Sequence, residues 1–283
     1  MARKLLFRCV AFCASTLLPG AAALAQSGVS GWGVQSFHSE WSHESFVSIS
    51  AGVNHTVACR SDGTIAIWGF GDHGQSPTPT LPPGVTFTKV AAGGMSNVGL
   101  CSDGTAIVWG TDLAPAPAPS QGTSFVDVTT SSLWFYPPWG YYTKPHGLAL
   151  RNDGQVVAWG NNAFGQCDVP TLPTGLSYIG IAEGSYHSLA LRSDGLVVAW
   201  GLGGAQLLVP QLPPGVSYLQ VAASDAHSLA RCSDGSVLAW GSNLFGQLNV
   251  PVLPPGSHIR GYRCGSATLL GPFERREHRG LGR

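Results

Sequence analysis

The chain contains 283 residues, of which 44% are hydrophobic and only 11% are charged, and it carries 38 glycines and 20 prolines. The low charge, together with 9 Trp, 7 Tyr and 11 Phe, excludes an intrinsically disordered protein. The glycine and proline content excludes a helical bundle or a coiled coil, because both residues break helices. The 15 basic and 15 acidic side chains balance, so no net field attracts nucleic acid or an acidic membrane surface.

Residues 1–25 have the layout of a secretory signal peptide. Three basic residues stand within the first eight positions, an apolar stretch follows, and an A-x-A cleavage motif ends at Ala25, directly before Gln26. The apolar stretch is short and is interrupted at Pro19, and no later segment is long and apolar enough to span a bilayer. We therefore expect a mature protein that begins at Gln26 and is secreted or periplasmic. Its 12 basic and 15 acidic side chains disfavour a nucleic-acid partner.

The rest of the chain is dominated by one repeat. An Asp-Gly dipeptide occurs five times, a Trp-Gly dipeptide begins six residues after each Asp, and the successive units are 41, 50, 41 and 40 residues apart. The aspartates are Asp62, Asp103, Asp153, Asp194 and Asp234, and the tryptophans are Trp68, Trp109, Trp159, Trp200 and Trp240. A period near 40 with several short strands per unit predicts the blades of a β-propeller. An α-helical solenoid would need two long helical patterns per unit, and the units contain none.

Each part of the repeat has a structural interpretation. Short apolar runs flank Asp-Gly, which is typical of a tight turn between two antiparallel strands whose Asp caps its own backbone. The positive φ angles of such a turn are tolerated by this dipeptide. The Trp is expected to wedge between neighbouring sheets, and the following Gly to supply a backbone conformation or a close approach that a Cβ would block. Pro-rich connectors such as VPQLPPG end the strands.

The two ends of the repeat complement each other. A sixth Trp-Gly begins at Trp32 without a front half before it, and residues 258–270 look like a front half without a Trp-Gly after it. Together the two halves would form one blade shared by both termini, which closes the ring and removes exposed sheet edges. We predict an all-β propeller of six blades, with seven as the alternative, that spans residues 26–271 as a single domain. The segment 272–283 departs from the repeat, and we expect a disordered tail there.

Five cysteines follow the predicted signal peptide, and none belongs to a CxxC motif. Their odd number and wide separation indicate neither a zinc site nor a dense disulfide framework. Buried thiols at repeat positions are the favoured interpretation, and one or two disulfides in the exported protein are the alternative. The cysteines are Cys59, Cys101, Cys167, Cys232 and Cys264.

The combined repeat resembles that of a known family. The segments HSLALRSDG, VVAWG, NxFGQ and VP are similar to the repeat of the regulator-of-chromosome-condensation propellers, over roughly residues 30–270. The AWG and VPxLPxG variants are most similar to those of bacterial secreted members. Roles known in this family include guanine-nucleotide exchange on a small nuclear GTPase, chromatin binding, and inhibition of β-lactamases. The resemblance implies a β-propeller, but a shared fold by itself transfers none of these roles.

Four histidines share one repeat position. They are His55, His146, His187 and His227, and Asn97 is expected at that position in the second unit. They could form a ring of metal ligands or bases, or each could tie its strand to neighbouring backbone. A ring of blades spreads such residues too widely for metal–ligand bonds of about 2 Å, which favours the structural interpretation. No nucleophile–base–orienter set is visible, and we expect no catalytic residue, cofactor or metal.

The third unit contains one break in the regular repeat. The step from Phe125 to His146 is 21 residues, against nine from Tyr178 to His187, so an insertion is expected as a loop on one face of the disc. This loop, over 131–145, contains Trp134, Phe135, Tyr136, Trp139, Tyr141 and Tyr142. Dense aromatic residues beside two prolines favour a binding surface. A loop that covers the disc or fills its channel is the alternative.

These observations favour an exported, non-enzymatic propeller that binds a protein or a cell-surface glycan through the aromatic loop. The alternative class is a propeller lyase or hydrolase that acts at the central channel. Its candidate side chains are His38, Glu40, His43, Glu44 and Glu183. Guanine-nucleotide exchange is implied by the family resemblance only, and export argues against it.

Overall fold

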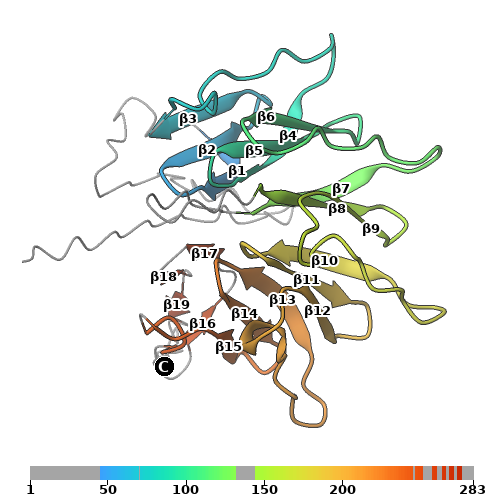
Figure 1. Cartoon of the computed structure of the whole chain (residues 1–283), viewed down its shortest axis with the longest axis vertical. Helices are drawn as coiled ribbons and strands as arrows, with labels where there is room; N and C mark the ends of the chain where they lie inside the picture. Colours follow the sequence, from blue (N-terminus) through green and yellow to red (C-terminus); the bar gives the residue numbers. More distant parts are fainter. Residues whose placement is uncertain are drawn as a thin grey trace, which may run out of the picture.

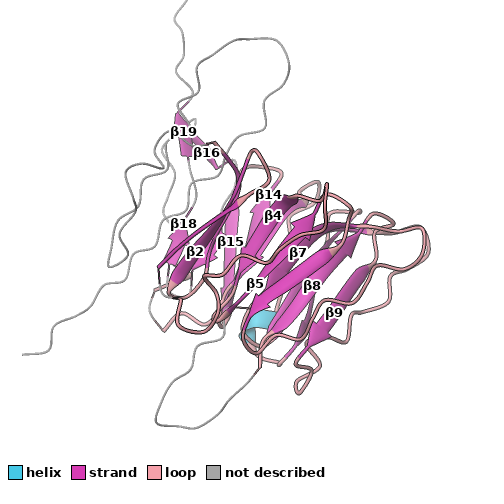
Figure 2. Cartoon of the chain, turned by 90° about the horizontal axis from the view of Figure 1, so that it is seen from above, coloured by secondary structure: helices cyan, strands magenta, loops and turns pink. Residues whose placement is uncertain are grey.

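The computed structural model describes residues 45–69, 71–131, 144–244 and 246–250, together with the backbone of four short strands between residues 257 and 275. Apart from one short 3₁₀ helix, η2 (Ala205–Leu207), the regular structure of this part of the chain is β (Figure 2). Strands β1 to β15 form five three-stranded antiparallel sheets, each built from three consecutive strands. One sheet corresponds to one unit of the repeat, so each sheet is a blade.

The blades have nearly identical bounds relative to the repeat. The first consists of β1 (Phe46–Ala51), β2 (His55–Arg60) and β3 (Ile65–Gly69). The second consists of β4 (Phe87–Ala92), β5 (Ser96–Cys101) and β6 (Ala106–Gly110). The third consists of β7 (Phe125–Thr130), β8 (His146–Arg151) and β9 (Val156–Gly160). The fourth consists of β10 (Tyr178–Glu183), β11 (His187–Arg192) and β12 (Val197–Gly201). The fifth consists of β13 (Tyr218–Ala223), β14 (His227–Cys232) and β15 (Val237–Gly241).

The Asp-Gly dipeptide forms the turn between the second and third strands of each blade. In the first blade the Gly63 N–H donates to the Arg60 carbonyl (3.0 Å), and the Asp62 carboxylate accepts the N–H of Thr64 (2.9 Å). Gly63 has a φ of +82°, whereas Asp62 does not adopt a positive φ. The turn is a three-residue hairpin loop with glycine in the left-handed region. The expectation that the dipeptide as a whole tolerates positive φ is therefore corrected: only the glycine needs to.

The glycine after each tryptophan is required for two reasons. Gly201 has a φ of +106°, and a Cβ on it would lie 2.5 Å from the Tyr186 carbonyl oxygen. At Gly110 and Gly241 a Cβ would meet a backbone carbonyl oxygen at 2.3 and 2.5 Å. The end of each third strand therefore lies directly against the connection between the first and second strands. Both the backbone conformation and the close approach expected from the sequence are present.

The hydrophobic core lies between the blades. Leu148 and Leu150 of the third blade pack with Tyr178, Ile181 and Trp200 of the fourth. The same combination, a second strand of one blade against the first and third strands of the next, recurs at the other three described interfaces. Each first strand contacts the first strand of the next blade, so the first strands lie nearest the axis. Figure 1 shows the blades following one another around an arc in sequence order.

Four short strands follow the fifth blade. β16 (Ser257–Ile259) pairs with β19 (Phe273–Arg275), and β17 (Arg263–Gly265) pairs with β18 (Thr268–Leu270). β17 contacts β13, where the C-terminal half of a shared blade would lie (Figure 1). β19 lies within the segment 272–283, for which a disordered tail is predicted, and its backbone pairs with that of β16.

The predicted N-terminal features lie outside the described residues. This applies to the signal peptide and to Trp32, so ring closure and the count of six blades stay predictions. Within the part of the chain that the structure describes, no helix is long and apolar enough to cross a membrane.

Candidate functional site

One end of each blade, which we call the loop face, carries the connection between the first and second strands and the segment that follows the third strand. The two come together because the first residue of each second strand pairs with the last residue of the third, as His187 does with Gly201. The connection is three residues long in four blades, for example Gly184–Tyr186 in the fourth. In the third blade it spans Ser131–Pro145.

The long connection leaves and re-enters the third blade at one point. The Ser131 N–H donates to the His146 carbonyl (3.2 Å), as the Gly184 N–H donates to the His187 carbonyl in the fourth blade (2.8 Å). The buried Ser131 hydroxyl accepts the N–H of His146 (3.1 Å). The connection therefore starts and ends on the loop face. The six aromatic residues predicted for binding lie outside the described residues: Trp134, Phe135, Tyr136, Trp139, Tyr141 and Tyr142.

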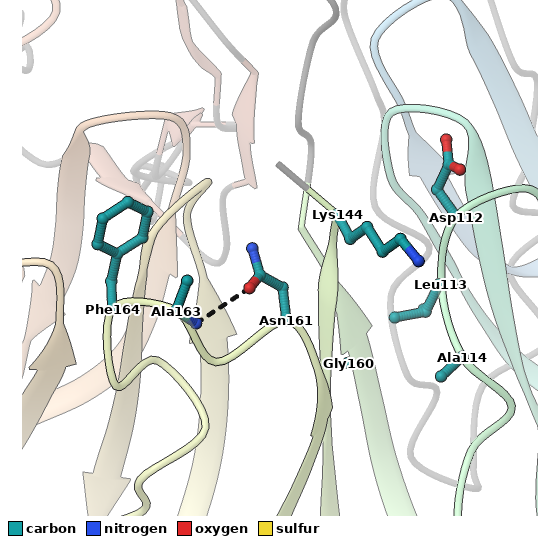
Figure 3. Close-up of a pocket in the computed structure, with 8 residues that line it drawn as sticks. All are labelled: Asp112, Leu113, Ala114, Lys144, Gly160, Asn161, Ala163 and Phe164. Atoms are coloured by element: carbon teal, nitrogen blue, oxygen red, sulfur yellow. Dashed lines mark hydrogen bonds between the residues drawn. The ribbon is translucent and has the colours of Figure 1, made fainter. Parts of the chain in front are cut away.

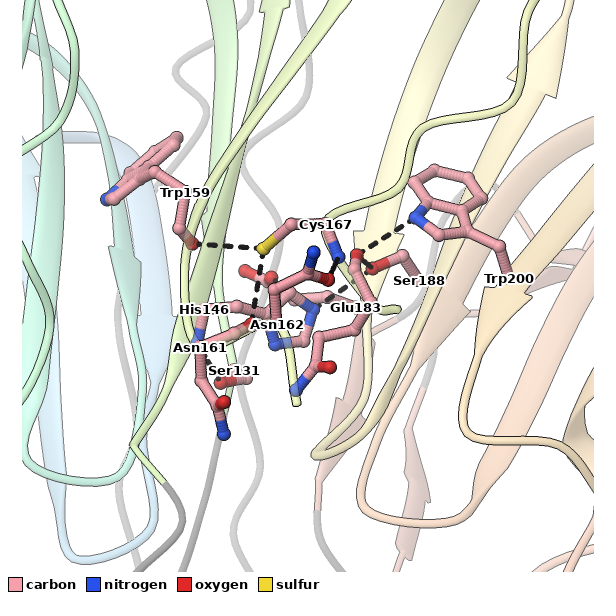
Figure 4. Close-up of polar contacts among 10 residues, drawn as sticks. Ser131, His146, Trp159, Asn161, Asn162, Cys167, Glu183, Ser188 and Trp200 are labelled. Atoms are coloured by element: carbon pink, nitrogen blue, oxygen red, sulfur yellow. Dashed lines mark hydrogen bonds and ion pairs between the residues drawn. The ribbon is translucent and has the colours of Figure 1, made fainter. Parts of the chain in front are cut away.

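The histidines lie buried inside the blade interfaces, as the third and fourth blades illustrate (Figure 4). His146 Nε2 of the third blade lies 3.0 Å from Ser188 Oγ of the fourth. The Ser188 hydroxyl donates to the Gln166 carbonyl (2.9 Å), so His146 is the donor in its own bond to Ser188. The Trp200 indole N–H donates to the same carbonyl (2.9 Å). We call this set of bonds the interblade network.

The network between the first and second blades uses an asparagine instead of a serine. His55 Nε2 lies 2.6 Å from Asn97 Oδ1, and the Asn97 amide donates to the Gln75 carbonyl (3.2 Å). The Trp109 indole N–H donates to that carbonyl as well (3.0 Å). Asn97 therefore stands one position after the histidine register, which Ser96 occupies because Ser96 pairs with Gly110. The expectation that Asn97 shares the histidine position is wrong.

The network between the fourth and fifth blades supports the same structural role. His187 Nε2 lies 2.8 Å from Ser228 Oγ, and the Trp240 indole N–H donates to the Gln206 carbonyl (2.9 Å). Burial lowers the pKa of His187 to about 4 and that of His146 to about 3, so these rings are neutral at pH 7. Among the described residues, no group of three or more His, Cys, Asp or Glu side chains could hold a metal ion.

The interface between the second and third blades differs from the others. Ser96 stands where the first, third and fourth blades have histidine, and its buried hydroxyl has no hydrogen-bond partner. Gly147 stands where the next blades have Ser188 and Ser228, so it offers no side chain to bond. The Trp159 indole N–H still donates across the interface, to the Ala114 carbonyl (3.0 Å). This interface therefore keeps the tryptophan contact and lacks the rest of the network.

Glu183 is the buried acid of the described chain. It ends β10, and its Oε2 lies 3.2 Å from His146 Nε2, with both side chains 0% exposed (Figure 4). Burial raises the pKa of Glu183 well above its usual value and lowers that of His146 to about 3, so it favours the neutral form of both groups. A hydrogen bond with the Thr129 side chain acts in the opposite direction and lowers the pKa of the carboxyl. The other candidates of the enzymatic alternative lie outside the described residues: His38, Glu40, His43 and Glu44.

The partners of the histidines were missed in the sequence analysis, although two signals mark them. A glutamine recurs six or seven residues after the tryptophan in four units, and a Ser or Asn directly precedes the apolar run of the second strand in three. The glutamines are Gln75, Gln166, Gln206 and Gln247. Their common offset indicates a shared backbone position, which is the carbonyl acceptor of the network.

The cysteines of the described residues are free thiols. Cys59, Cys101 and Cys232 are buried, as the favoured interpretation expects, and Cys167 is half-buried. Burial raises the pKa of both Cys59 and Cys167 to about 11, which keeps these thiols protonated and poorly nucleophilic at neutral pH. Cys264 lies in a strand of which only the backbone is described.

A pocket of about 790 Å³ opens on the loop face between the second and third blades (Figure 3). One wall is the segment after β6, and the other comes from the end of the β7–β8 connection, the last residue of β9 and the segment after it. Asp112 and Leu113 belong to the first wall, and Lys144, Asn161 and Phe164 belong to the second. The pocket therefore lies at the interface that lacks the network, next to the anchors of the long connection.

Sequence comparison identifies the repeat. The regulator of chromosome condensation (RCC1) repeat matches residues 46–75, 146–166, 179–205 and 219–247. These segments fall on the first, third, fourth and fifth blades, in which the histidine of the network is present. No curated protein sequence matches the chain.

Solved structures with the same fold include Prp20p of Saccharomyces cerevisiae, with 22% identity and a TM-score of 0.57. They also include the receptor-kinase ectodomains of CR4 from Physcomitrella patens (16%, 0.58) and ACR4 from Arabidopsis thaliana (21%, 0.59). These matches cover 81, 77 and 79% of this chain, and 65, 56 and 74% of the respective structures. The chain thus spans less than two thirds of the first two. The comparisons confirm the predicted propeller fold, and the RCC1 repeat is present in four of the five blades that the structure describes.

Proposed function

We propose that this protein is an exported, non-enzymatic propeller that binds another protein through its loop face. The observation that carries the proposal is the connection between β7 and β8. Four blades join their first and second strands with three residues, whereas the third uses Ser131–Pro145. Both anchors of this long connection lie on the loop face, because Ser131 bonds to His146 at the start of β8.

The inserted residues are not needed to build the blade. The third blade has its interblade core, its turn and its Trp-Gly contact from repeat residues alone. An insertion with six aromatic residues therefore has a composition suited to contacts outside the blade, since Trp and Tyr supply large contact area at low conformational entropy cost.

The described acid and base favour binding over catalysis. Glu183 and His146 are 0% exposed, so neither can touch a substrate in this conformation. Burial favours the neutral form of both, and His146 is already engaged with Ser188 of the next blade. This pair is a part of the blade interface.

Similar propellers bind proteins. Prp20p is described as binding Gsp1p and histones, and a second structure contains Kap60 bound to yeast RCC1 (Prp20). The similarity to these proteins is 22% identity, so we carry over protein binding as a class and not these partners.

Export is supported by the layout of residues 1–25. N-terminal sequencing of the protein recovered outside the cytosol is expected to begin at Gln26. Recovery of the chain in the cytosol with residues 1–25 intact would contradict export and revive the nucleotide-exchange alternative.

The binding role is tested by two variants of the long connection. In the first, a single serine replaces residues 132–144, which gives Ser131-Ser-Pro145 and reproduces the length of Gly184–Tyr186. In the second, the loop keeps its length and its six aromatic residues become serine. Binding of the immobilised protein to proteins of the native envelope and secreted fractions is measured by quantitative mass spectrometry. We expect both variants to lose the partners that the wild type retains, by at least about tenfold.

The outcome separates the possibilities. Unchanged retention of the same proteins by both variants would remove the loop face from the proposal. Loss with the first variant and retention with the second would assign binding to the loop backbone or to Lys144, which the first variant also removes, and not to the six aromatic side chains. Retention of purified cell-wall polysaccharide, with no protein retained, would replace the protein partner by a glycan.

A further inference from the structure

The pocket between the second and third blades originates in a shortened segment. The step from Gly69 to Phe87 in the first blade and from Gly160 to Tyr178 in the third is 18 residues. From Gly110, the corresponding step in the second blade is 15 residues. In the first, third and fourth blades this segment contains a glutamine whose carbonyl accepts the indole N–H of the next blade. The shorter segment of the second blade lacks this glutamine and therefore its carbonyl.

The shortened segment explains why a hollow is present here. At the other described interfaces the glutamine turn lies against the next blade and supplies the acceptor for its tryptophan, as Gln166 does for Trp200. Here only Ala114 reaches Trp159, and about 790 Å³ stay open above this contact. The shortened segment and the long β7–β8 connection are independent departures from the repeat, and both affect the same interface on the same face. Regular blades elsewhere show that stability requires neither.

The two walls of the pocket carry opposite charges. Asp112 is exposed on the wall from the second blade, and Lys144 is exposed on the wall from the third. Figure 3 shows the Lys144 side chain extending across the pocket toward the second-blade wall, with the Asp112 carboxylate beside it. No ion pair within 4.0 Å joins either to another described residue. Asp112 has a φ of +73°, the only positive value of a non-glycine residue in the described chain.

Apolar groups also line the pocket. The Phe164 side chain is 40% exposed, and its ring stands edge-on to Tyr186, with 5.5 Å between the ring centroids. Leu113 lies on the other wall, where its Cδ1 is 3.0 Å from the position of a Cβ on Gly160 (Figure 3). The Asn161 carbonyl oxygen Oδ1 is occupied by the Ala163 N–H (3.0 Å), which leaves the Asn161 amide N–H groups directed toward the pocket.

We propose that this pocket takes an extended segment of a partner protein. An apolar side chain of that segment enters between Leu113 and Phe164, an acidic side chain pairs with Lys144, and a basic side chain pairs with Asp112. This inference rests on the proposed function and specifies the chemistry of its partner. Fixed charges of both signs suit a peptide, whereas a neutral glycan would leave both charges unpaired on binding.

The test uses displayed random 12-residue peptides as the probe, selected on the chain from Gln26 onward. We expect selected sequences to combine one large apolar residue with an acidic and a basic residue on either side. For a synthetic peptide of the selected sequence, Lys144→Glu is expected to weaken binding by about tenfold or more, and Asp112→Asn by about threefold to tenfold. Asn tolerates the positive φ of Asp112, so this variant removes the charge without straining the backbone. A peptide with its acidic residue changed to lysine is expected to recover affinity for Lys144→Glu.

Matched controls lie on the same face. Asp72→Asn removes an exposed acid after the Trp-Gly of the first blade, and Leu244→Ala removes an 85% exposed leucine of the fifth. Both are expected to change affinity by less than about twofold. Circular dichroism spectra that match the wild type show that the variants are folded.

Several results would overturn the inference. They are the selection of no peptide, affinity that is indifferent to both charge variants, or binding of neutral glycans that depends on Phe164 but not on either charge. One combination of results would overturn this inference and leave the proposed function standing. In it, the variant with six aromatic residues changed to serine loses its partners, while Lys144→Glu and Asp112→Asn bind them normally.

Discussion

Two neighbouring interfaces have similar hydrophobic cores but different polar contacts. One joins the third and fourth blades, and the other joins the second and third blades. At the third–fourth interface, Leu148 and Leu150 pack against Trp200. At the second–third interface, Val98 and Leu100 pack against Trp159. The third–fourth interface also contains the full interblade network, whereas the second–third interface retains only the hydrogen bond from the Trp159 indole to the Ala114 carbonyl. The comparison indicates that the tryptophan wedge is sufficient to stack two blades and that the network adds to it.

The difference extends to where the tryptophan ring lies. A Cβ on Gly147 would meet the Trp159 ring at 2.5 Å, so the ring occupies space over this residue. Its counterpart Ser188 uses its side chain to bond the Gln166 carbonyl. The second–third interface therefore cannot regain the network by one substitution, because Trp159 fills the position where the serine hydroxyl would lie.

The largest effect is expected from removing a wedge. Trp200→Ala deletes a side chain that is 6% exposed, and it removes one of the two donors to the Gln166 carbonyl. We expect the free energy of unfolding to fall by about 3–5 kcal/mol, from lost burial and the remaining cavity. Urea unfolding followed by circular dichroism measures it. A loss below about 1 kcal/mol would contradict the wedge role.

Removing a histidine from the network is expected to cost less. His187→Ala empties a 0% exposed site and leaves Ser228 without its partner, which should lower the free energy of unfolding by about 2–4 kcal/mol. A double-mutant cycle with Ser228→Ala isolates the bond across the interface. We expect a coupling of about 1 kcal/mol, and strict additivity of the two losses would show that the contact contributes nothing.

The substitution Gly147→Ser tests whether the second–third interface has been repacked. It introduces the residue found at positions 188 and 228, yet its Cβ would lie 2.5 Å from the Trp159 ring. We expect destabilisation of about 1–3 kcal/mol from overpacking, measured by the urea midpoint. Stabilisation would mean that Trp159 moves easily and that the two interfaces are interchangeable.

Acid is expected to weaken the interfaces that contain the network. The folded-state pKa of His187 is about 4, below its unfolded value near 6.5, so the folded state binds fewer protons. The stability contributed by the neutral ring is complete above about pH 6.5 and is lost as the pH falls toward 4, at about 1.4 kcal/mol per pH unit for each such histidine. Thermal unfolding between pH 7 and pH 4.5 measures the slope. His187→Gln should reduce it, and an unchanged slope would contradict the assignment.

Glu183 provides a control of opposite sign. Its folded-state pKa is raised by burial, so the folded state keeps a proton that the unfolded chain releases. The stability due to the neutral carboxyl is present at low pH and is lost as the pH rises toward the folded-state pKa. Because this loss begins at the unfolded-state pKa of about 4.3, it opposes the histidine effect in the same pH range, so Glu183→Gln is expected to steepen the net acid slope between pH 4.5 and pH 7.

The blades could be predicted from the sequence because their signals are local. Asp62 and Gly63 define a turn, Trp200 and Gly201 define the end of a strand, and the 40-residue period fixes their register. The partner of His55 could not be derived in this way, because Asn97 lies 42 residues away on the next blade.

The candidate site was predictable only in part. The long β7–β8 connection was visible as an excess of residues, whereas the shortened segment after Gly110 produces a pocket only through the path of its backbone. Asn97 was placed one position too early because its polarity, and not its distance from Trp109, was used for alignment. Twelve residues separate Asn97 from Trp109, against 13 between His146 and Trp159, so counting back from the tryptophan assigns Ser96 to the histidine position.

The smallest effect is expected at Ser96, and it decides whether the two interfaces truly differ. The Ser96 side chain is buried and its hydroxyl has no hydrogen-bond partner, so Ser96→Ala removes a desolvated polar atom that makes no bond. We expect a change within about 0.5 kcal/mol, with slight stabilisation allowed by the same reasoning. The matched variant Ser188→Ala removes a hydroxyl that joins His146 to the Gln166 carbonyl, and it should cost about 1–2 kcal/mol. Equal losses in the urea midpoints of the two variants would mean that Ser96 bonds across the second–third interface after all, and that the polar contents of the two interfaces are the same.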